Sequence, residues 1–466
     1  MGKKKELIRE LEITDLAAEG FGIGRNNGKV VFVPYVAPGD IVDVQPGRNR
    51  KKFQEGRAIK FHKHSEIRTR PFCEHFGTCG GCKWQHIPYE QQAAFKEQQV
   101  KDQLSRLSTI ELPHINSIIT APEEKYYRNK LEYTFSNQRW LTTEEIQSGE
   151  KIERRGVGFH IPKMFDKILD LNECFLQDPI SSDIRNSLKE FALKSDFSFY
   201  NVHDHKGLLR NLIIRNTTKG DLMVIVQFGE DQTEQIKSVM DFLSDRFPEI
   251  TSLFYVINLK KNETFHDQEL ILYKGEPFIK ESLGETIYQI GPKSFFQTNS
   301  KQAKSMYDLV LEYAELSGSE LVYDLYTGTG TIANYLAKHA KKVVGVEYVP
   351  EAIEDAKINS EINGITNTSF FSGDMAEVLN DDFVKENGKP DLIITDPPRA
   401  GMHEKVIKSI LDVQAEKIIY VSCNPATQAR DLTLLDEKYS VKIVQPIDMF
   451  PHTQHVECVV LLQLRD

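Results

Sequence analysis

The chain has 466 residues, of which 40% are hydrophobic and 27% are charged, and its formal net charge is −10 at pH 7. This length predicts two to four domains, and the negative charge excludes a uniformly basic nucleic-acid binder. No apolar run approaches the ~20 residues that a membrane helix needs. The basic start at residues 1–6 has neither the apolar segment of a secretory signal nor the Ser or Thr of a myristoylation motif. We therefore expect a cytoplasmic protein without a membrane partner.

Residues 1–62 predict a small β module. Residues 7–13 alternate in polarity, residues 20–24 form a glycine-rich turn, and residues 29–33 and 41–44 are apolar strands. Short strands punctuated by glycine favour a small barrel of the OB type, which is a common nucleic-acid platform, although other small β-barrels fit the same pattern.

A basic segment follows the first predicted strands. Residues 48–70 contain nine Lys or Arg residues and two Glu residues, which gives a net charge of +7 (9 − 2). Such a segment can attract phosphates even on an acidic protein, although it can also be a solvated charged face. We expect it to contribute to RNA binding.

Residues 63–284 predict a central domain of mixed α+β structure. Apolar periodicity changes several times along this stretch, as in a mixed sheet with covering helices. The expected elements are helices at 90–107 and 234–247, strands at 208–215 and 222–228, and an exposed polar loop at 138–155.

Four of the six cysteines suggest a metal centre. Cys73, Cys79 and Cys82 follow one another with x5 and x2 spacing, and Cys174 lies far downstream. Disulfides are rare in the cytoplasm, so this spacing indicates metal binding or catalysis. Four thiolates suit either structural zinc or an iron–sulfur cluster, although the spacing is unusual for a zinc ribbon.

From residue 285 to residue 466, short apolar runs alternate with helical patterns. This alternation is typical of a doubly wound parallel sheet, so the C-terminal domain is expected to be Rossmann-like. The runs lie at 321–325, 342–346, 368–371, 391–395 and 417–421, and a last buried strand lies at 458–464.

The expected carboxyl ends of these strands carry a glycine loop and several acids. Residues 324–330, Asp-Leu-Tyr-Thr-Gly-Thr-Gly, lack the third glycine of the dinucleotide motif. Glu347 can accept hydrogen bonds from ribose hydroxyls, and Asp374 is placed to reach the adenine side. Asp396, in an Asp-Pro-Pro loop, can orient a planar base or the cofactor, or it can simply form a turn. The pattern favours S-adenosylmethionine (SAM) over NAD, although a domain without a ligand also fits.

A cysteine and an acid complete this edge. Cys423 follows the predicted strand at 417–421, and Glu457 ends a His-rich loop that enters the last strand. Addition of a thiolate to carbon 6 of uracil makes carbon 5 nucleophilic toward the SAM methyl group, and a base must then remove the carbon 5 proton. We predict Cys423 as the nucleophile and Glu457 as the base; the alternatives are a buried hydrophobic cysteine and a solvent-facing strand start.

Seven motifs together resemble the class I RNA 5-methyluridine methyltransferases, and specifically the 23S ribosomal RNA (uracil-5-)-methyltransferase branch with a TRAM domain and an iron–sulfur cluster. The resemblance covers nearly the whole chain. Two departures, Thr327 where many members carry Cys and Cys458 where a small or polar residue is expected, remove no required group. The motifs lie at 20–34, 127–130, 295–299, 324–330, 396–401, 422–425 and 450–457.

The resemblance implies roles for individual residues. Cys423 and Glu457 match the family's nucleophile and base. The implied SAM site consists of Gln297, Tyr326, Thr331, Glu347, Asp374 and Asp396. The implied [4Fe-4S] ligands are Cys73, Cys79, Cys82 and Cys174.

The resulting expectation is a monomeric, cytoplasmic, SAM-dependent enzyme that methylates carbon 5 of a specific uridine in 23S rRNA. The target base must leave its stack first, and Phe295 or Phe296 is a candidate stacking partner, unless both are core residues. The alternatives are a non-catalytic RNA-binding assembly factor, a tRNA uracil-5 methyltransferase, and a methyltransferase acting on an exocyclic base nitrogen, which needs no thiol.

Overall fold

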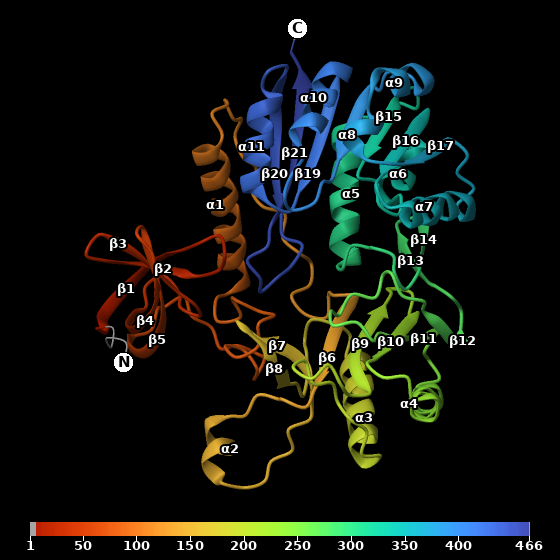
Figure 1. The fold of residues 1–466 in the computed structure, drawn as a ribbon. Helices are drawn as coiled ribbons and strands as arrows, with labels where there is room; N and C mark the ends of the chain where they lie inside the picture. The colour runs from red at the N-terminus through yellow and green to blue at the C-terminus, as the bar shows by residue number, and fades with distance from the viewer. Residues whose placement is uncertain (1–5, 466) are drawn as a thin grey trace.

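The computed structural model describes residues 6–465 (Figure 1). The expectation about the basic start at residues 1–6 therefore lies almost entirely outside the described residues. Within residues 6–465, no helix combines the length and the apolar character that crossing a bilayer requires.

The amino-terminal strands form a closed five-stranded barrel in the order β1-β2-β3-β5-β4. Its interior is filled by alternate side chains such as Leu11, Val31 and Val42, all buried. The interior is crowded at Gly22, where a Cβ atom would lie 2.3 Å from Cγ2 of Val36. The prediction of an OB-type barrel is confirmed. Its strands are β1 (Ile8–Leu16), β2 (Gly22–Asn26), β3 (Lys29–Val33), β4 (Ile41–Asn49) and β5 (Phe53–Lys63).

The central part is built on a seven-stranded mixed sheet in the order β12-β11-β10-β9-β6-β7-β8. Its central strands are buried on both faces, and the buried cluster on one face includes side chains of α3 and α4. The strands are β6 (Lys130–Ser136), β7 (Gly156–Ile161), β8 (Met164–Asp170), β9 (Leu209–Asn216), β10 (Leu222–Phe228), β11 (Ser252–Ile257) and β12 (Ile271–Gly275). The helices are α1 (Tyr89–Leu107), α2 (Thr143–Ser148), α3 (Ile180–Lys194) and α4 (Thr233–Arg246).

The polar segment at 138–155 is not entirely a loop, because it contains α2. Thr142 caps this helix by accepting from the backbone N–H of Glu145, and the Glu145 carboxylate accepts in return from the N–H of Thr142. No residue of α2 is buried, so the helix depends on this capping box.

The C-terminal part contains a second seven-stranded sheet, in the order β17-β16-β15-β18-β19-β21-β20. Strands β15 to β19 are parallel, and β21 pairs antiparallel with both β19 and β20. The strands are β15 (Leu321–Leu325), β16 (Lys342–Glu347), β17 (Thr368–Ser372), β18 (Leu392–Thr395), β19 (Lys417–Ser422), β20 (Tyr439–Ile447) and β21 (Glu457–Leu464), and a separate hairpin is formed by β13 (Ile279–Leu283) and β14 (Thr286–Ile290).

Helices cover both faces of this sheet. Val343 belongs to the buried cluster that includes α5 and α6, whereas the next residue, Val344, belongs to the cluster that includes α10 and α11. This is the doubly wound α/β arrangement that the sequence predicted. The helices are α5 (Ser300–Ala314), α6 (Thr331–Leu336), the 3₁₀ helix η1 (Ala337–His339), α7 (Pro350–Ile362), α8 (Met375–Val378), α9 (Asp381–Asn387), α10 (Glu404–Val413) and α11 (Pro425–Leu435).

The parts of the chain share buried surface. Val100 and Leu104 of α1 join the cluster on the α10 and α11 side, and Ile213 and Met223 of the central sheet join the cluster that contains Met306 of α5. Figure 1 also shows the connection between β20 and β21 extending from the lower edge of the C-terminal sheet toward the amino-terminal half of the chain. The predicted boundaries at 62/63 and 284/285 therefore stay predictions.

Candidate active site

The carboxyl ends of the parallel strands meet at the lower edge of the C-terminal sheet in Figure 1. In the register of these strands, Leu325 lies opposite both Val346 and Thr395. The residues that follow, Tyr326, Glu347 and Asp396, therefore emerge side by side at one edge. Open α/β sheets bind their ligands at such edges.

The glycine loop after β15 is tied to Glu347. The backbone N–H of Gly328 donates to Oε2 of Glu347 at 3.1 Å, and the N–H of Val349 donates to Oε1 at 3.0 Å. Gly330 has φ +71°, and a Cβ atom there would lie 2.8 Å from Cβ of Ala356. Only glycine fits this position without displacement. Each oxygen of Glu347 keeps further acceptor capacity, which a ribose hydroxyl can use.

Three further residues of the predicted SAM set lie around this loop. Thr331 begins α6 and accepts a hydrogen bond from the Tyr307 hydroxyl at 3.0 Å. The carbonyl of Gln297 accepts from Nδ2 of Asn129 at 2.8 Å, which fixes the segment before α5. Asp374 is exposed after the edge strand β17 and caps α8.

Asp324, the first residue of the motif at 324–330, is a structural acid. It is 1% exposed, and its Oδ2 accepts from Oγ1 of Thr327 at 2.5 Å and from the N–H of Ala333 at 3.1 Å. Burial raises the pKa of Asp324 to about 7. The side chain therefore joins the glycine loop to the start of α6.

Cys423 and Glu457 are brought together by the pairing of β19 with β21. Ser422 lies opposite Cys458 in this antiparallel pair, so the next pair toward the edge is Cys423 and Glu457. Cys423 is partly exposed and Glu457 is buried. The nucleophile and the base expected from the sequence are therefore neighbours across one strand pair.

The electrostatics of this pair also involve Asp396 and Arg399. Burial, reinforced by the negative charges of Glu457 and Asp396, raises the pKa of the Cys423 thiol to about 11, and the positive charge of Arg399 opposes this shift. Burial and Asp396 raise the pKa of Glu457 well above its usual value, again against Arg399. Burial raises the pKa of Asp396 itself to about 7. Shifted acids of this kind gather at catalytic sites.

Arg399 is a further residue of this edge that was not predicted from the sequence. It stands directly after the Asp-Pro-Pro loop that was singled out, and its side chain is exposed. As the cation that acts on both Cys423 and Glu457, it favours the ionised form of each.

The two candidate stacking residues differ in exposure. Phe296 is 5% exposed and packs on Tyr288 with ring centroids 5.8 Å apart, whereas Phe295 is 68% exposed. The carbonyl of Phe295 accepts from Oγ1 of Thr329 at 3.3 Å, which places this residue beside the glycine loop. Phe296 is a core residue, and Phe295 is free to contact a ligand.

Two family models match the chain. Residues 217–465 match the family described as tRNA (uracil-5-)-methyltransferase, and residues 9–62 match the TRAM domain of tRNA (uracil(54)-C(5))-methyltransferase. An uncharacterized RNA methyltransferase of Bacteroides thetaiotaomicron is 54% identical over 454 residues, covering 97% of this chain and 100% of the relative. The chain belongs to the RNA (uracil-5-)-methyltransferase family. A second uncharacterized RNA methyltransferase, from Porphyromonas gingivalis, is 52% identical over 460 residues, covering 97% of this chain and 99% of the relative.

The methyltransferase is also similar to a solved structure. The tRNA (uracil-54, C5)-methyltransferase of Pyrococcus abyssi, in complex with S-adenosyl-L-homocysteine, is 30% identical with a TM-score of 0.76, covering 98% of this chain and 100% of that one. The expectation of a SAM-dependent RNA uracil-5 methyltransferase with a TRAM barrel is confirmed at this level. Membership of the uracil-5 family argues against the alternative of a methyltransferase that acts on an exocyclic base nitrogen.

Four of the six cysteines, Cys73, Cys79, Cys82 and Cys174, line one small cavity of about 30 Å³ beside β7. The Gly81 N–H donates to Sγ of Cys79 at 3.4 Å. Burial, followed by the charges of the neighbouring cysteines, raises the pKa of Cys79 to about 11 and that of Cys82 to about 12. Among residues 6–465, no group of three or more His, Cys, Asp or Glu side chains is arranged to hold a single metal ion.

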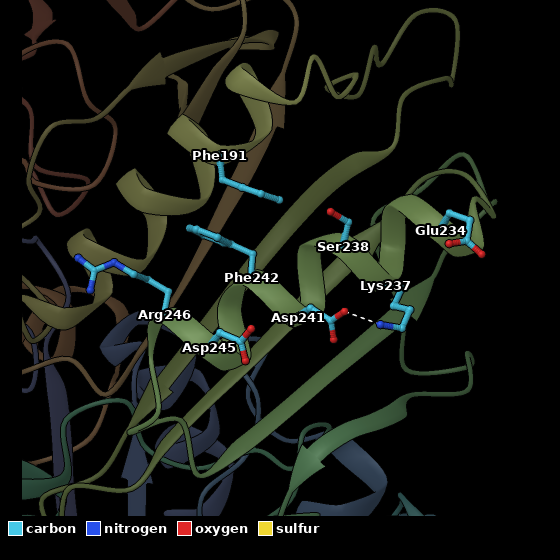
Figure 2. Close-up of a pocket in the computed structure, with 8 residues that line it drawn as sticks. All are labelled: Phe191, Glu234, Lys237, Ser238, Asp241, Phe242, Asp245 and Arg246. Carbon is cyan, nitrogen blue, oxygen red and sulfur yellow. Dashed lines mark hydrogen bonds and ion pairs between the residues drawn. The ribbon is translucent and has the colours of Figure 1, made fainter.

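A surface groove of ≈ 600 Å³ lies elsewhere on the methyltransferase, between α3 and α4 (Figure 2). Phe191 and Phe242 stack there with ring centroids 4.2 Å apart, and Lys237 pairs with Asp241 on the same helix. The groove contains no residue predicted for the site, and it belongs to the outer face of the central sheet.

Proposed function

We propose that this methyltransferase modifies carbon 5 of a specific uridine in 23S ribosomal RNA, with Cys423 as the nucleophile and Glu457 as the base. The observation that carries this proposal is the pairing of β19 with β21, since it sets a partly exposed thiol beside a buried carboxyl group at the edge with the glycine loop.

Cys423 acts first. After its proton is lost to solvent, Sγ forms a bond to carbon 6 of the uracil, and the electron pair of the 5,6 double bond moves toward carbon 5 and the carbonyl at carbon 4. Bound SAM would supply an electrophilic methyl group, which carbon 5 takes while the bond from that methyl group to sulfur breaks and S-adenosylhomocysteine leaves. Glu457 then removes the proton from carbon 5, the 5,6 double bond re-forms, and the bond from carbon 6 to Sγ breaks. The thiolate is thereby restored, and no redox reagent is required.

The raised pKa of Glu457 suits this last step. A carboxylate whose proton is held more tightly than usual is a stronger base toward the carbon 5 proton. Burial also keeps bulk water from competing for the carboxylate, because Glu457 is 7% exposed. Proton transfer of this kind contributes about 10²–10⁴-fold to the rate.

We assign the SAM site to the residues expected from the sequence. Glu347 would bind the ribose hydroxyls, and Asp374 the adenine side. Glu347 accepts from the glycine loop, and the backbone N–H of Gly373, next to Asp374, donates to the carbonyl of Glu347 at 2.9 Å, which supports this assignment. The full proposed set is Gln297, Tyr326, Thr331, Glu347, Asp374 and Asp396.

We also propose a [4Fe-4S] cluster on Cys73, Cys79, Cys82 and Cys174. The gathering of four cysteines in one small lining supports it, because thiols with raised pKa values ionise together only when iron or another cation neutralises their charges. Iron and sulfide analysis of the anaerobically purified protein tests this, and stoichiometric zinc without iron would contradict it.

The ribosomal substrate rests on the resemblance of the cysteine spacing and the TRAM barrel to the 23S rRNA branch. A tRNA substrate is the second candidate, because the solved relative from Pyrococcus abyssi acts on uracil-54 of tRNA. Mapping 5-methyluridine in 23S rRNA and tRNA from a deletion strain separates the two. If 23S rRNA keeps all its 5-methyluridine while a tRNA loses it, the ribosomal assignment is wrong.

The role of Cys423 needs its own experiment. The wild-type protein should form an adduct with 5-fluorouridine RNA that survives denaturation, and Cys423→Ala should form none. Loss of 5-methyluridine in a strain that carries Cys423→Ala would separate catalysis from an assembly role.

The proposal includes the remaining expectations. The enzyme would act as a monomer in the cytoplasm, with an RNA-binding part at 1–62, a central part at 63–284 and a catalytic part at 285–466. It would flip its target base out of the stack, with Phe295 as the exposed stacking partner.

A further inference from the structure

The loop that carries Glu457 is held by residues from the other end of the chain. This base loop, residues 448–456, connects β20 to β21 and ends directly before Glu457. The carbonyl oxygen of His452 accepts the backbone N–H groups of Lys83 at 2.8 Å and Trp84 at 3.2 Å. Lys83 and Trp84 are the two residues that follow Cys82, so the cysteine segment contacts the base loop through its backbone.

Gln92 of α1 strengthens this connection. Its side chain is fully buried, its Oε1 accepts the backbone N–H of His452 at 2.8 Å, and its Nε2 donates to the carbonyl of Trp84 at 3.1 Å. Nε2 also donates to the carbonyl of Ile87 at 2.8 Å. A single amide therefore joins the cysteine segment to the base loop, and no apolar side chain can replace these bonds.

Aromatic contacts join the other cysteines to the same loop. The ring of His452 packs edge-on against Phe72 with centroids 5.0 Å apart, and Phe72 packs against Phe175 at 5.3 Å. Phe72 precedes Cys73, and Phe175 follows Cys174. Neighbours of three of the four cysteines thus contact His452 or its ring partner.

The base loop itself is compact, so a shift at His452 reaches Glu457. Oγ1 of Thr453 donates to the carbonyl of Phe450 at 2.8 Å and accepts the N–H of His455 at 3.3 Å. Val456 is 1% exposed. Short internal hydrogen bonds and a buried anchor leave few residues that can absorb a displacement.

We propose that Gln92 and the cysteine segment, residues 73–84, position Glu457 for removal of the carbon 5 proton, acting through His452. This inference rests on the proposed role of Glu457 as the base. Gln92 is a positioning residue, because its hydrogen bonds all go to protein groups in loops and none to the reacting edge. Four cysteines held together fix the segment that supports the base.

The order of the chemical steps gives this inference a specific signature. Glu457 acts only after the methyl group has been transferred. A displaced Glu457 therefore leaves thiol addition and methyl transfer intact and delays release. The enzyme should then accumulate as a covalent adduct that carries the new methyl group, with an ordinary uridine RNA as substrate.

The test uses the full-length protein with its cysteine centre intact. Gln92→Leu removes the hydrogen bonds of the side-chain amide and keeps a side chain of similar size. The probes are 23S rRNA and bulk tRNA purified from the deletion strain, with SAM labelled in its methyl group. We expect turnover to fall ~10–10²-fold, as for misplacement of a catalytic group, while labelled methyl appears in a denaturation-resistant protein–RNA band. Gln98→Leu, on the exposed face of the same helix, is the matched control and should behave like the wild type.

Glu457→Gln is the reference variant, which separates the proposed role of Glu457 as the base from the proposed positioning role of Gln92. If Glu457→Gln accumulates no methylated adduct, the proposed role of the base is wrong. If Glu457→Gln accumulates the adduct but Gln92→Leu loses adduct formation and turnover in equal proportion, Gln92 is merely structural and the inference is overturned. Should Gln92→Leu fail to fold, Phe72→Leu is the second variant, because it removes the ring contacts with His452 and Phe175 and leaves the hydrogen bonds of Gln92 in place. It is expected to accumulate the adduct to a smaller extent. Unchanged turnover and adduct in that variant would overturn the role of the cysteine segment.

Discussion

A buried ion pair anchors the first residue of the base loop, and its removal should be costly. Nζ of Lys96 lies 2.6 Å from Oδ1 of Asp448, and both side chains are fully buried. Nζ also donates to the carbonyl of Phe450 at 3.0 Å. Lys96→Met would leave the Asp448 carboxylate buried without a cation. Breaking such a pair costs about 3–5 kcal/mol, which corresponds to about 10²–10⁴-fold in the folding equilibrium of this region.

A local tryptophan makes this prediction measurable. Nζ of Lys96 lies 6.0 Å from the ring centroid of Trp84, and the chain has only one other tryptophan, Trp140. In a Trp140→Phe background, urea unfolding followed by Trp84 fluorescence reports on the region around the ion pair. A transition midpoint lowered by an amount equivalent to about 3–5 kcal/mol is expected for Lys96→Met.

The matched control lies on the same helix. Lys101 pairs with Glu97 at 2.6 Å, but the Lys101 side chain is 37% exposed. Lys101→Met should therefore cost no more than about 0.5 kcal/mol. Adding Asp448→Asn to Lys96→Met should restore most of the stability, because it removes the unpaired charge and keeps an acceptor for the Phe450 N–H. If Lys96→Met destabilises this region no more than Lys101→Met does, the reasoning from burial is refuted.

Three further predictions concern the site and the barrel. Burial raises the pKa of Cys423 to about 11, so its thiolate becomes more abundant as pH rises. The rate of adduct formation with 5-fluorouridine RNA should therefore increase ~10-fold per pH unit between pH 7 and 9. A plateau below pH 8 would contradict this. Gly330→Ala should weaken SAM binding by about tenfold or more in calorimetry, because the new Cβ would lie 2.8 Å from Cβ of Ala356. The control is Gly364→Ala, which also has a positive φ, +64°, but has open space around it and should leave the affinity for SAM unchanged. Replacing Lys51 and Lys52 by Gln should make the plot of the logarithm of the RNA association constant against the logarithm of salt concentration less steep, by ~0.7–0.9 in slope for each lost phosphate contact. The affinity for SAM should not change. An unchanged slope would show that these lysines do not contact the RNA.

The fold was accessible from the sequence where local pattern decides it. The alternation of apolar runs and helical periods located the parallel strands, and the run at 321–325 is β15 as predicted. The short helix α2 was missed, although the Thr142 and Glu145 of its capping box were visible in the sequence. The polar composition of residues 138–155 predicted a loop, but the capping box within this segment starts a helix.

The site was only partly accessible. A position after a parallel strand placed Cys423 at the ligand edge, but the nearness of Glu457 depends on the pairing of Ser422 with Cys458, which no local pattern fixes. Phe295 is 68% exposed and Phe296 is 5% exposed, and the sequence cannot say which of two adjacent phenylalanines faces the core. The contact of Gln92 with His452 has no signal in a single sequence, because it joins a helix and a loop far apart in the chain.

The separation of these contacts along the chain also bears on the order in which the protein folds. Gln92 and His452 are 360 residues apart, and Lys96 and Asp448 are 352 apart. Contacts across such distances form late, because the chain loses the entropy of closing a long loop before they stabilise it. The barrel strands pair largely with near neighbours and can form early. A folding molecule is therefore expected to form its barrel first, and to support the proposed base, Glu457, only when the two ends of the chain have met.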